Sequence, residues 1–350
     1  MPVASAATRG GREPSGGWIM GRHVEGLSVV ITGASSGIGR AAAIAFARAG
    51  ANLALAARRA DLLREVAAEC RALGAHAVAV PTDVTDAEAM EDLADAAKRA
   101  FGRIDVWINN AGTGVFGPYM NADIALHRRT IEVNLLGAMH GAYAALPHFR
   151  RQRGGILINN VSLGGWAPTP FAAAYTASKF GLRGFSAALR QELGGERGIR
   201  VCAVFPAMID TPGLEHGANV SGRAIDPGPL VWAPEDVAEA FLSLVRWPRD
   251  EVAVGWPARA AQAAYALAPG PTEHLMGAVV RRSLARAERA PRTEGALLEP
   301  VAQGRGASGG WRARKGLPRS ARAPSTAIGL AALAGLGLFL GTRALARARR

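Results

Sequence analysis

Lysine is scarce in this 350-residue chain: Lys98, Lys179 and Lys315 are the only lysines among 41 basic side chains. Basic excess is also missing from the middle of the chain. Residues 25–250 carry 22 basic and 22 acidic side chains, whereas residues 251–350 carry 16 basic and 5 acidic ones. A groove for nucleic acid needs positive charge on the folded body. We therefore expect no nucleic-acid partner, and the basic tail needs another explanation.

Cysteine is nearly absent as well, since Cys70 and Cys202 are the only two. Two cysteines are too few for a disulfide framework, which indicates a reducing compartment. The seven histidines show no metal-ligand spacing, so no metal is inferred, and the G-x-S-x-G elbow of hydrolases is missing. Residues 1–24 lack the apolar run of a secretory signal and are predicted to be a disordered N-terminal extension. Met20 is the alternative to Met1 as the expected start of the protein.

Short apolar runs alternate with longer amphipathic stretches over residues 25–256. The runs are nearly continuous in Val, Ile, Leu and Ala, as expected of strands that are covered on both faces. This predicts one α/β domain, a doubly wound parallel sheet (Rossmann fold) of about seven strands with right-handed crossovers. The apolar runs lie at 27–32, 51–57, 76–82, 104–110, 155–162, 200–206 and 251–255, and helices are predicted at 60–73, 86–101, 122–150, 173–193 and 235–247.

The alternation stops after residue 256 and leaves a C-terminal extension. Residues 257–290 are predicted to be a basic helical extension that packs on the domain or, as the alternative, lies on a membrane surface. Residues 291–323 are rich in Gly, Pro and Arg and are predicted to be a flexible linker.

Residues 324–350 contain an uncharged stretch at 326–341 and an Arg-rich end, which predicts a membrane-anchoring helix with the α/β domain on the cytoplasmic side. The sixteen uncharged residues are short for a hydrocarbon core, so an interfacial helix is the alternative.

The first predicted strand runs directly into the stretch TGASSGIGR and then a helix. Gly33, Gly37 and Gly39 leave backbone N–H groups bare at the helix start, so that a phosphate can approach them. Gly37, Gly39 and Ala42 also fit the G-x-G-x-x-G/A spacing of dinucleotide-binding folds. The alternative is a tight turn that binds no ligand.

The end of the second predicted strand indicates which dinucleotide binds. Folds that prefer NAD place an acidic residue there, and this chain has Ala57 followed by Arg58 and Arg59. A guanidinium binds a 2′-phosphate through paired N–H donors, with Ser35 as a further helper. NADP(H) is therefore the preferred cofactor and NAD(H) the alternative, unless the two arginines only cap a helix.

Lys179 follows Tyr175 by four residues, so both side chains project from one face of a predicted helix. Ser162 lies at the end of the fifth predicted strand, where open α/β sheets form their ligand crevice. A nearby cation lowers the pKa of a tyrosine and suits it to acid–base catalysis. The compact ammonium of lysine fits between a tyrosine and sugar hydroxyls where the planar arginine fork does not. An exposed helix pair is the simpler alternative for Tyr175 and Lys179.

With these motifs, the chain resembles the short-chain dehydrogenase/reductase family over about residues 25–255. The matching stretches are TGASSGIG (32–39), DV (83–84), NNAG (109–112), VN (133–134), the Ser162–Tyr175–Lys179 set and PAMIDT (206–211), in which Ala207 stands where the family usually has Gly.

The resemblance implies that Tyr175 is the acid–base residue, that Ser162 holds the substrate oxygen, and that Asn134 organises a water relay to Lys179. Lys179 would also bind the nicotinamide ribose. The expected cofactor-binding set is Gly33, Ser35, Ser36, Gly37, Ile38, Gly39, Arg58, Asp83, Val84, Asn110, Ala111, Gly112, Tyr175, Lys179, Pro206 and Thr211.

The expected function is an NADP(H)-dependent alcohol dehydrogenase or carbonyl reductase. Trp166, Met208, Leu214 and Leu230 are predicted to line an apolar pocket, which suits a lipophilic alcohol or ketone. A homo-oligomer is also expected. The alternative is a membrane-attached, cofactor-binding scaffold or sensor with little turnover. The complete set of Ser162, Tyr175 and Lys179 favours the enzyme, because a scaffold has no need to keep it.

Overall fold

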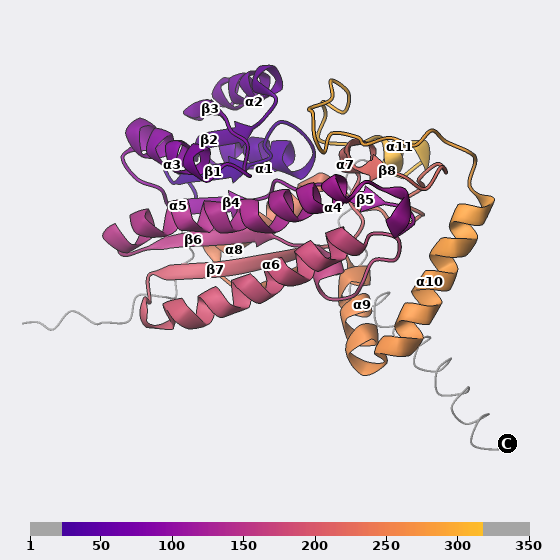
Figure 1. The fold of residues 1–350 in the computed structure, drawn as a ribbon. Coiled ribbons are helices and arrows are strands. Elements are labelled where there is room, and N and C mark those ends of the chain that lie inside the picture. The colour runs from indigo at the N-terminus through magenta and orange to yellow at the C-terminus, as the bar shows by residue number, and fades with distance from the viewer. Residues whose placement is uncertain (1–22, 318–350) are drawn as a thin grey trace, which may run out of the picture.

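The computed structural model describes residues 23–317, in which a parallel sheet lies between two layers of helices (Figure 1). Its seven strands have the order β3-β2-β1-β4-β6-β7-β9. The order reverses between β1 and β4, and ligands bind doubly wound sheets at such a switch point. The strands are β1 (Ser28–Thr32), β2 (Asn52–Ala57), β3 (Ala77–Pro81), β4 (Val106–Asn109), β6 (Gly155–Asn160), β7 (Ile199–Pro206) and β9 (Glu251–Val254).

All seven predicted apolar runs form strands of this sheet, which confirms the predicted fold class. Strands β1 and β6 are buried along their whole length. They have no polar face because helices cover both sides of the sheet.

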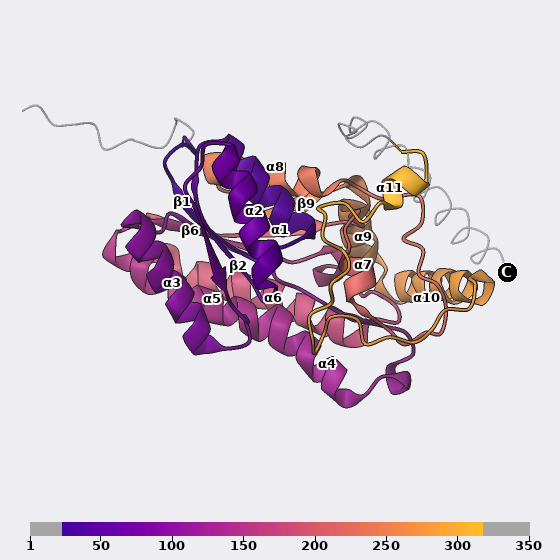
Figure 2. The ribbon, with the colours of Figure 1, turned by 90° about the horizontal axis from the view of Figure 1, so that it is seen from above.

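The helices form one layer on each face of the sheet (Figure 2). One layer contains α1 (Gly37–Arg48), α2 (Ala60–Ala72) and α8 (Pro234–Arg246). The other contains α3 (Ala87–Phe101), α5 (Gly137–Arg151) and α6 (Ala173–Glu192), with α4 (Ile124–Ile131) packed along α6.

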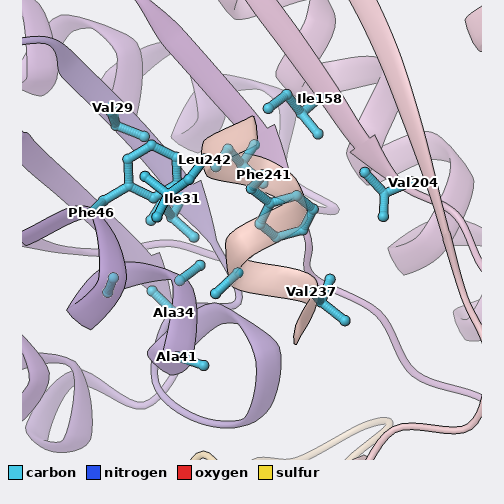
Figure 3. Close-up of a cluster of buried hydrophobic side chains, with 14 of the residues drawn as sticks. Val29, Ile31, Ala34, Ala41, Phe46, Ile158, Val204, Val237, Phe241 and Leu242 are labelled. Carbon is cyan, nitrogen blue, oxygen red and sulfur yellow. The ribbon is translucent and has the colours of Figure 1, made fainter. Parts of the chain in front are cut away.

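The core on the α1 side shows what holds these layers together (Figure 3). Phe46 of α1 and Phe241 of α8 are fully buried against Ile31 of β1. Burying a side chain of this size stabilises a fold by about 1.5–3 kcal/mol. Two helices far apart in the sequence are thereby fixed beside the strand that leads into the glycine-rich loop.

The helix predicted over 122–150 is interrupted. It consists of α4, a π-helical turn at Glu132–Leu136, and α5. A π-helical turn contains one extra residue and often marks a functional site. Asn134 lies within it.

The helix predicted over 257–290 is also two helices, α9 (Trp256–Leu267) and α10 (Pro269–Arg286). The break falls at Ala268, since a residue that precedes proline disfavours the helical conformation. Leu275 and Val279 of α10 are 56% and 51% exposed, so the apolar face predicted to pack on the domain largely faces outward. Within residues 23–317, no helix is both long and apolar enough to cross a membrane.

The segment after α10 does not behave as the predicted free linker. Residues 293–310 run past α4, α1 and α7 (Gly213–His216) and lead into α11 (Trp311–Arg314) (Figure 2). Thr293 pairs with Asn219 of β8 (Ala218–Asn219), which itself pairs with β5 (Val115–Phe116). Residues 318–323 of the predicted linker and the predicted anchor at 326–341 lie outside the described residues, as does most of the N-terminal extension.

Candidate active site

Ser162 and Tyr175 are brought together at the carboxyl end of the sheet. Ser162 follows β6, and its hydroxyl is hydrogen-bonded to the Tyr175 phenol. Gly164 lies between them, because a Cβ there would be 3.2 Å from Tyr175 Cε1 and 3.5 Å from Ser162 Oγ. The Ser162 backbone has φ 155° and ψ 161°, a region that is almost exclusive to glycine. Strain of this kind is found at functional sites, where surrounding structure holds it in place.

Lys179 is 5% exposed and projects from α6 on the same side as Tyr175. Its Nζ donates to the Asn160 carbonyl at 3.0 Å and lies 5.7 Å from the centroid of the Tyr175 ring. Burial lowers the pKa of Lys179 to about 8. The ammonium is therefore held where its charge is costly, which is typical of a site built for chemistry rather than for stability.

Burial raises the pKa of Tyr175, and the hydrogen bond with Ser162 only partly opposes this effect. The lowering of the Tyr175 pKa by Lys179 that the sequence predicts is not among the causes of this shift, in which desolvation of the phenolate is the largest effect. Tyr175 is thus a neutral phenol at neutral pH, in the state that donates a proton.

Asn134 is placed by the π-helical turn and is 1% exposed. Its Nδ2 donates to Thr113 O at 2.8 Å and to Ser178 Oγ at 2.9 Å, and its Oδ1 accepts from Thr113 N at 2.8 Å. A Cβ at Gly112 would lie 3.4 Å from Asn134 Oδ1 and 3.7 Å from Lys179 Nζ. Gly112 therefore leaves open the space between the amide and the ammonium.

The NNAG stretch joins the carboxyl ends of three strands. Asn110 N donates to Thr32 Oγ1 at 3.0 Å, Asn110 Nδ2 donates to Thr32 O at 2.9 Å, and Asn110 Oδ1 accepts from Asn160 Nδ2 at 2.9 Å. Gly33 has φ +66°, and a Cβ there would lie 2.8 Å from Ala111 Cα. Asn110, Ala111 and Gly33 thus shape the crevice by packing.

Arg59 joins the predicted glycine-rich loop directly. Its Nη2 donates to Ser36 Oγ at 2.6 Å and to Ser35 Oγ at 3.2 Å. Its neighbour Arg58 turns instead to backbone carbonyls of the C-terminal segment, with Nη1 donating to Leu298 O at 3.0 Å. Gly37 N also donates to that segment, at Gly306 O, over 2.9 Å.

Asp83 lies at the far end of the crevice, and Arg129 binds its carboxylate at 2.5 Å. Burial opposes ionisation of Asp83, but hydrogen bonds from Thr85 and Arg129 outweigh it and lower the pKa of the carboxyl. Val84 is buried beside Gly137.

The remaining predicted cofactor residues are dispersed around the crevice. Thr211 lies next to Gly37, Pro206 ends β7, and Gly39 is packed against Gly33 O. The side chain of Ile38 packs against the core.

One predicted pocket residue has a different place. Trp166 is buried, its ring is stacked on Phe205 with centroids 3.8 Å apart, and its Nε1 donates to Glu251 Oε2 at 3.2 Å. It therefore supports the loop after Ser162 from within the core. Met208 and Leu230 are 37% and 45% exposed, so both remain available to a ligand.

Several residues at the site were not predicted. Thr113 and Ser178 hold Asn134, and Arg129 pairs with Asp83. Ser178 directly precedes Lys179 in the sequence, and this neighbourhood is the one sequence signal that places Ser178 at the site. Neither Thr113 nor Arg129 belongs to a pattern that would separate it from other surface-type residues.

The residues present fit the phosphate groups of a dinucleotide. Ser35, Ser36 and Arg59 gather hydroxyl and guanidinium donors beside the start of α1, and Arg58 directly precedes Arg59 at the end of β2. Such donors suit phosphate oxygens. At the other end, a Cβ at Gly114 would lie 3.1 Å from Tyr175 Cδ2, so the glycine keeps the approach to the phenol open.

A doubly wound sheet with a Gly-rich turn at its switch point and a Ser–Tyr–Lys set beyond it defines a dinucleotide-dependent oxidoreductase. Residues 28–218 match the model of the short chain dehydrogenase family, and the chain belongs to that family. It is therefore an NAD(P)-dependent dehydrogenase that acts on CH–OH groups.

Similar proteins include the uncharacterized oxidoreductase YxnA of Bacillus subtilis, which is 35% identical over 320 residues that cover 88% of each chain. A 3beta-hydroxysteroid dehydrogenase of Eggerthella lenta is 39% identical over 62% of this chain and 85% of its own length. A metagenomic short-chain oxidoreductase solved in complex with NADP is 32% identical, with a TM-score of 0.57 over 67% of this chain and 98% of that chain.

Proposed function

We propose that the chain is an oxidoreductase that prefers NADP(H) and interconverts an alcohol and a ketone on a lipophilic small molecule. The single observation that carries the preference is the donor cluster of Arg59, Ser35 and Ser36 at the start of α1, with Arg58 beside it. The two residues directly after β2 are arginines, so no carboxylate stands there to repel a 2′-phosphate. The NADP complex of the metagenomic relative supports the same choice.

The cofactor supplies or accepts the hydride, and side chains of the protein donate or accept the proton. In the direction of reduction, Ser162 donates a hydrogen bond to the carbonyl oxygen and Tyr175 gives that oxygen its proton. Lys179 holds positive charge near the phenolate that forms and binds the nicotinamide ribose. Asn134, with Thr113 and Ser178, positions a water relay that returns a proton towards Lys179.

A lipophilic substrate is supported by the side chains around the loop that follows Ser162. Pro168, Pro170, Tyr265 and Met276 line a largely apolar cavity of about 200 Å³ between this loop and helices α9 and α10. Exposed Met208 adds apolar surface just after the end of β7, and exposed Leu230 lies two residues before Trp232, whose N donates to Met208 O at 2.8 Å. The 3beta-hydroxysteroid dehydrogenase among the relatives makes steroids the first alcohols to test.

The direct test follows NADPH absorbance with a panel of steroid, terpenoid and aliphatic ketones and, in reverse, their alcohols. Tyr175→Phe removes the transferable proton, and we expect it to reduce turnover by about 10³-fold while NADP⁺ still binds. Tyr143→Phe is the matched control, since Tyr143 is 71% exposed on α5 and should keep full activity. Substantial turnover by Tyr175→Phe would exclude the proposed acid–base role.

We also propose, on sequence grounds, that residues 326–341 attach the protein to a membrane with the catalytic domain on the cytoplasmic side. The test compares the full-length chain with one truncated after residue 323. The full-length chain should pellet with membranes and resist carbonate, whereas the truncated chain should be soluble and active. A fully soluble intact chain would exclude the anchor and leave the enzymatic proposal intact.

A further inference from the structure

The segment of residues 296–306, hereafter the strap, crosses the nucleotide end of the crevice and is anchored on both sides. At its start, Leu297 is completely buried among Val115, Leu126 and Val220. Just beyond its end, the Asp210 carboxylate accepts from Ser308 Oγ at 2.7 Å and from Trp311 N at 2.9 Å. The strap is therefore a bound part of the domain.

Between these anchors, carbonyl oxygens of the strap occupy the arginine donors. Arg58 donates to Ala296 O at 2.5 Å and to Leu298 O at 3.0 Å. Arg59 donates to Gln303 O at 3.0 Å. Six of the strap's eleven carbonyls, those of residues 296, 297, 298, 301, 303 and 304, lie within hydrogen-bonding distance of these two guanidiniums.

The strap also accepts hydrogen bonds from the glycine-rich loop and the first turn of α1. Gly37 N, the first backbone donor of α1, donates to Gly306 O at 2.9 Å. Arg40, one turn along α1, donates through Nη1 to Arg305 O at 2.7 Å. A helix N-terminus with a guanidinium beside it is suited to bind an anion. In this structure the same donors instead bind uncharged carbonyl oxygens of the strap.

We propose that the strap and the phosphates of NADP(H) compete for the same donors, so that the cofactor binds by displacing the middle of the strap. This inference rests on the proposed cofactor, because the donors shared with the strap are those assigned to the phosphates. A phosphate forms charge-assisted hydrogen bonds that are stronger than those of a carbonyl, so it wins the donors once it is bound. Strap closure raises the apparent Kd for the cofactor, which equals the Kd of the open state divided by the fraction of molecules in which the strap is open.

The part of the strap after Leu297 is suited to release, while the anchors at Leu297 and Asp210 stay in place. Residues 298–300, 302, 303, 305 and 306 are exposed, and Gly304 has φ +66°, a conformation that glycine adopts without strain. The only side-chain ion pair of this stretch within residues 23–317 joins Arg305 to Glu65, and both side chains are about half exposed. Exposed pairs of this kind contribute little to stability.

Trypsin reports strap release directly in the unmodified full-length chain. The Arg305–Gly306 bond lies in the strap and becomes a substrate when the strap leaves the crevice. We expect saturating NADP⁺ to accelerate cleavage after Arg305 by about tenfold, while cleavage after Arg197, far from the crevice in the turn that precedes β7, stays unchanged. Slower or unchanged cleavage after Arg305 in samples that bind NADP⁺ would mean that the strap stays closed over the cofactor, and would overturn the competition.

A pair of adjacent variants tests the same point through binding. Leu297→Ala removes a buried anchor, whereas Leu298→Ala trims a neighbour that is 44% exposed, and both keep the carbonyls that bind Arg58. We expect Leu297→Ala to lower the Kd for NADP⁺ in calorimetry by about fivefold, and Leu298→Ala to leave it within about twofold. An unchanged or weaker Kd in Leu297→Ala overturns the competition.

The outcomes separate this inference from the proposed function. If NADP⁺ binds and supports turnover but the strap is protected, the competition alone fails. If neither the unmodified chain nor Leu297→Ala binds NADP⁺, both the cofactor assignment and the competition fail.

Discussion

The two ends of the crevice are held in different ways. At the reaction end, Lys179 and Asn134 are almost fully buried and bonded to Asn160 O, Thr113 and Ser178. At the nucleotide end, Arg58 and Arg59 are half-buried and bonded to the strap. The difference teaches that the groups proposed for proton transfer are positioned in advance, whereas the groups proposed for phosphate binding are bonded to a segment that the proposed competition would displace.

The largest effect should come from a change at the buried end that keeps the charge. Lys179→Arg places a wide planar guanidinium in a site where Nζ lies between Asn160 O and the space left by Gly112. We expect kcat/KM to fall by about 10²-fold or more. Steady-state kinetics with NADPH and the best ketone of the panel provide the measurement. Parental activity would show that lysine is not required there.

The buried charge of Lys179 should also lower the free energy of unfolding of the chain. Burial lowers the pKa of Lys179 from 10.5 to about 8, so the folded state binds its proton less tightly than the unfolded state does. The folded chain carries the full penalty below pH 8, and the penalty disappears as pH rises towards 10.5. Lys179→Met should therefore raise the free energy of unfolding at pH 7 by on the order of 2–3 kcal/mol.

This gain should shrink when both chains are compared by urea unfolding at pH 9.5, because the parent then loses its buried charge. A Lys179→Met chain that is less stable than the parent at pH 7 would contradict the desolvation argument.

The smallest effect should come from the exchangeable end. Arg58→Asp replaces a donor by a carboxylate that repels a 2′-phosphate, and we expect the KM for NADPH to rise by about tenfold relative to the KM for NADH. Arg64→Asp, an exposed position on α2, is the control and should leave the ratio of the two constants unchanged. Equal kinetics with NADPH and NADH in the unmodified chain would exclude the proposed preference.

The sheet could be predicted closely because its information is local. Each apolar run agrees with its strand to within two residues, since continuous burial on both faces leaves a continuous apolar sequence. Ser162, Tyr175 and Lys179 could be placed at one end of that sheet from their positions alone.

The features that sequence analysis missed have no comparable pattern. The π-helical turn at Glu132–Leu136 differs from an α-helix by one inserted residue, which changes no hydrophobic period that a short window can detect. The sequence predicts a linker over the strap because its Gly and Pro content is typical of linkers. The strap binds through its backbone carbonyls, and because every residue has one, these contacts leave no pattern in the strap's own sequence. Only the donors that bind it, Arg58 and Arg59, can be recognised from the sequence.

The position of the strap in the chain has a consequence for the order of synthesis. The last strand of the sheet ends at Val254, and the strap begins about 40 residues later. At roughly 5–20 residues per second, a ribosome needs some seconds to make that stretch. All strands of the sheet and the glycine-rich loop are therefore translated before the strap. Under the proposed competition, a chain that stops before residue 296 carries an open nucleotide crevice with no internal competitor.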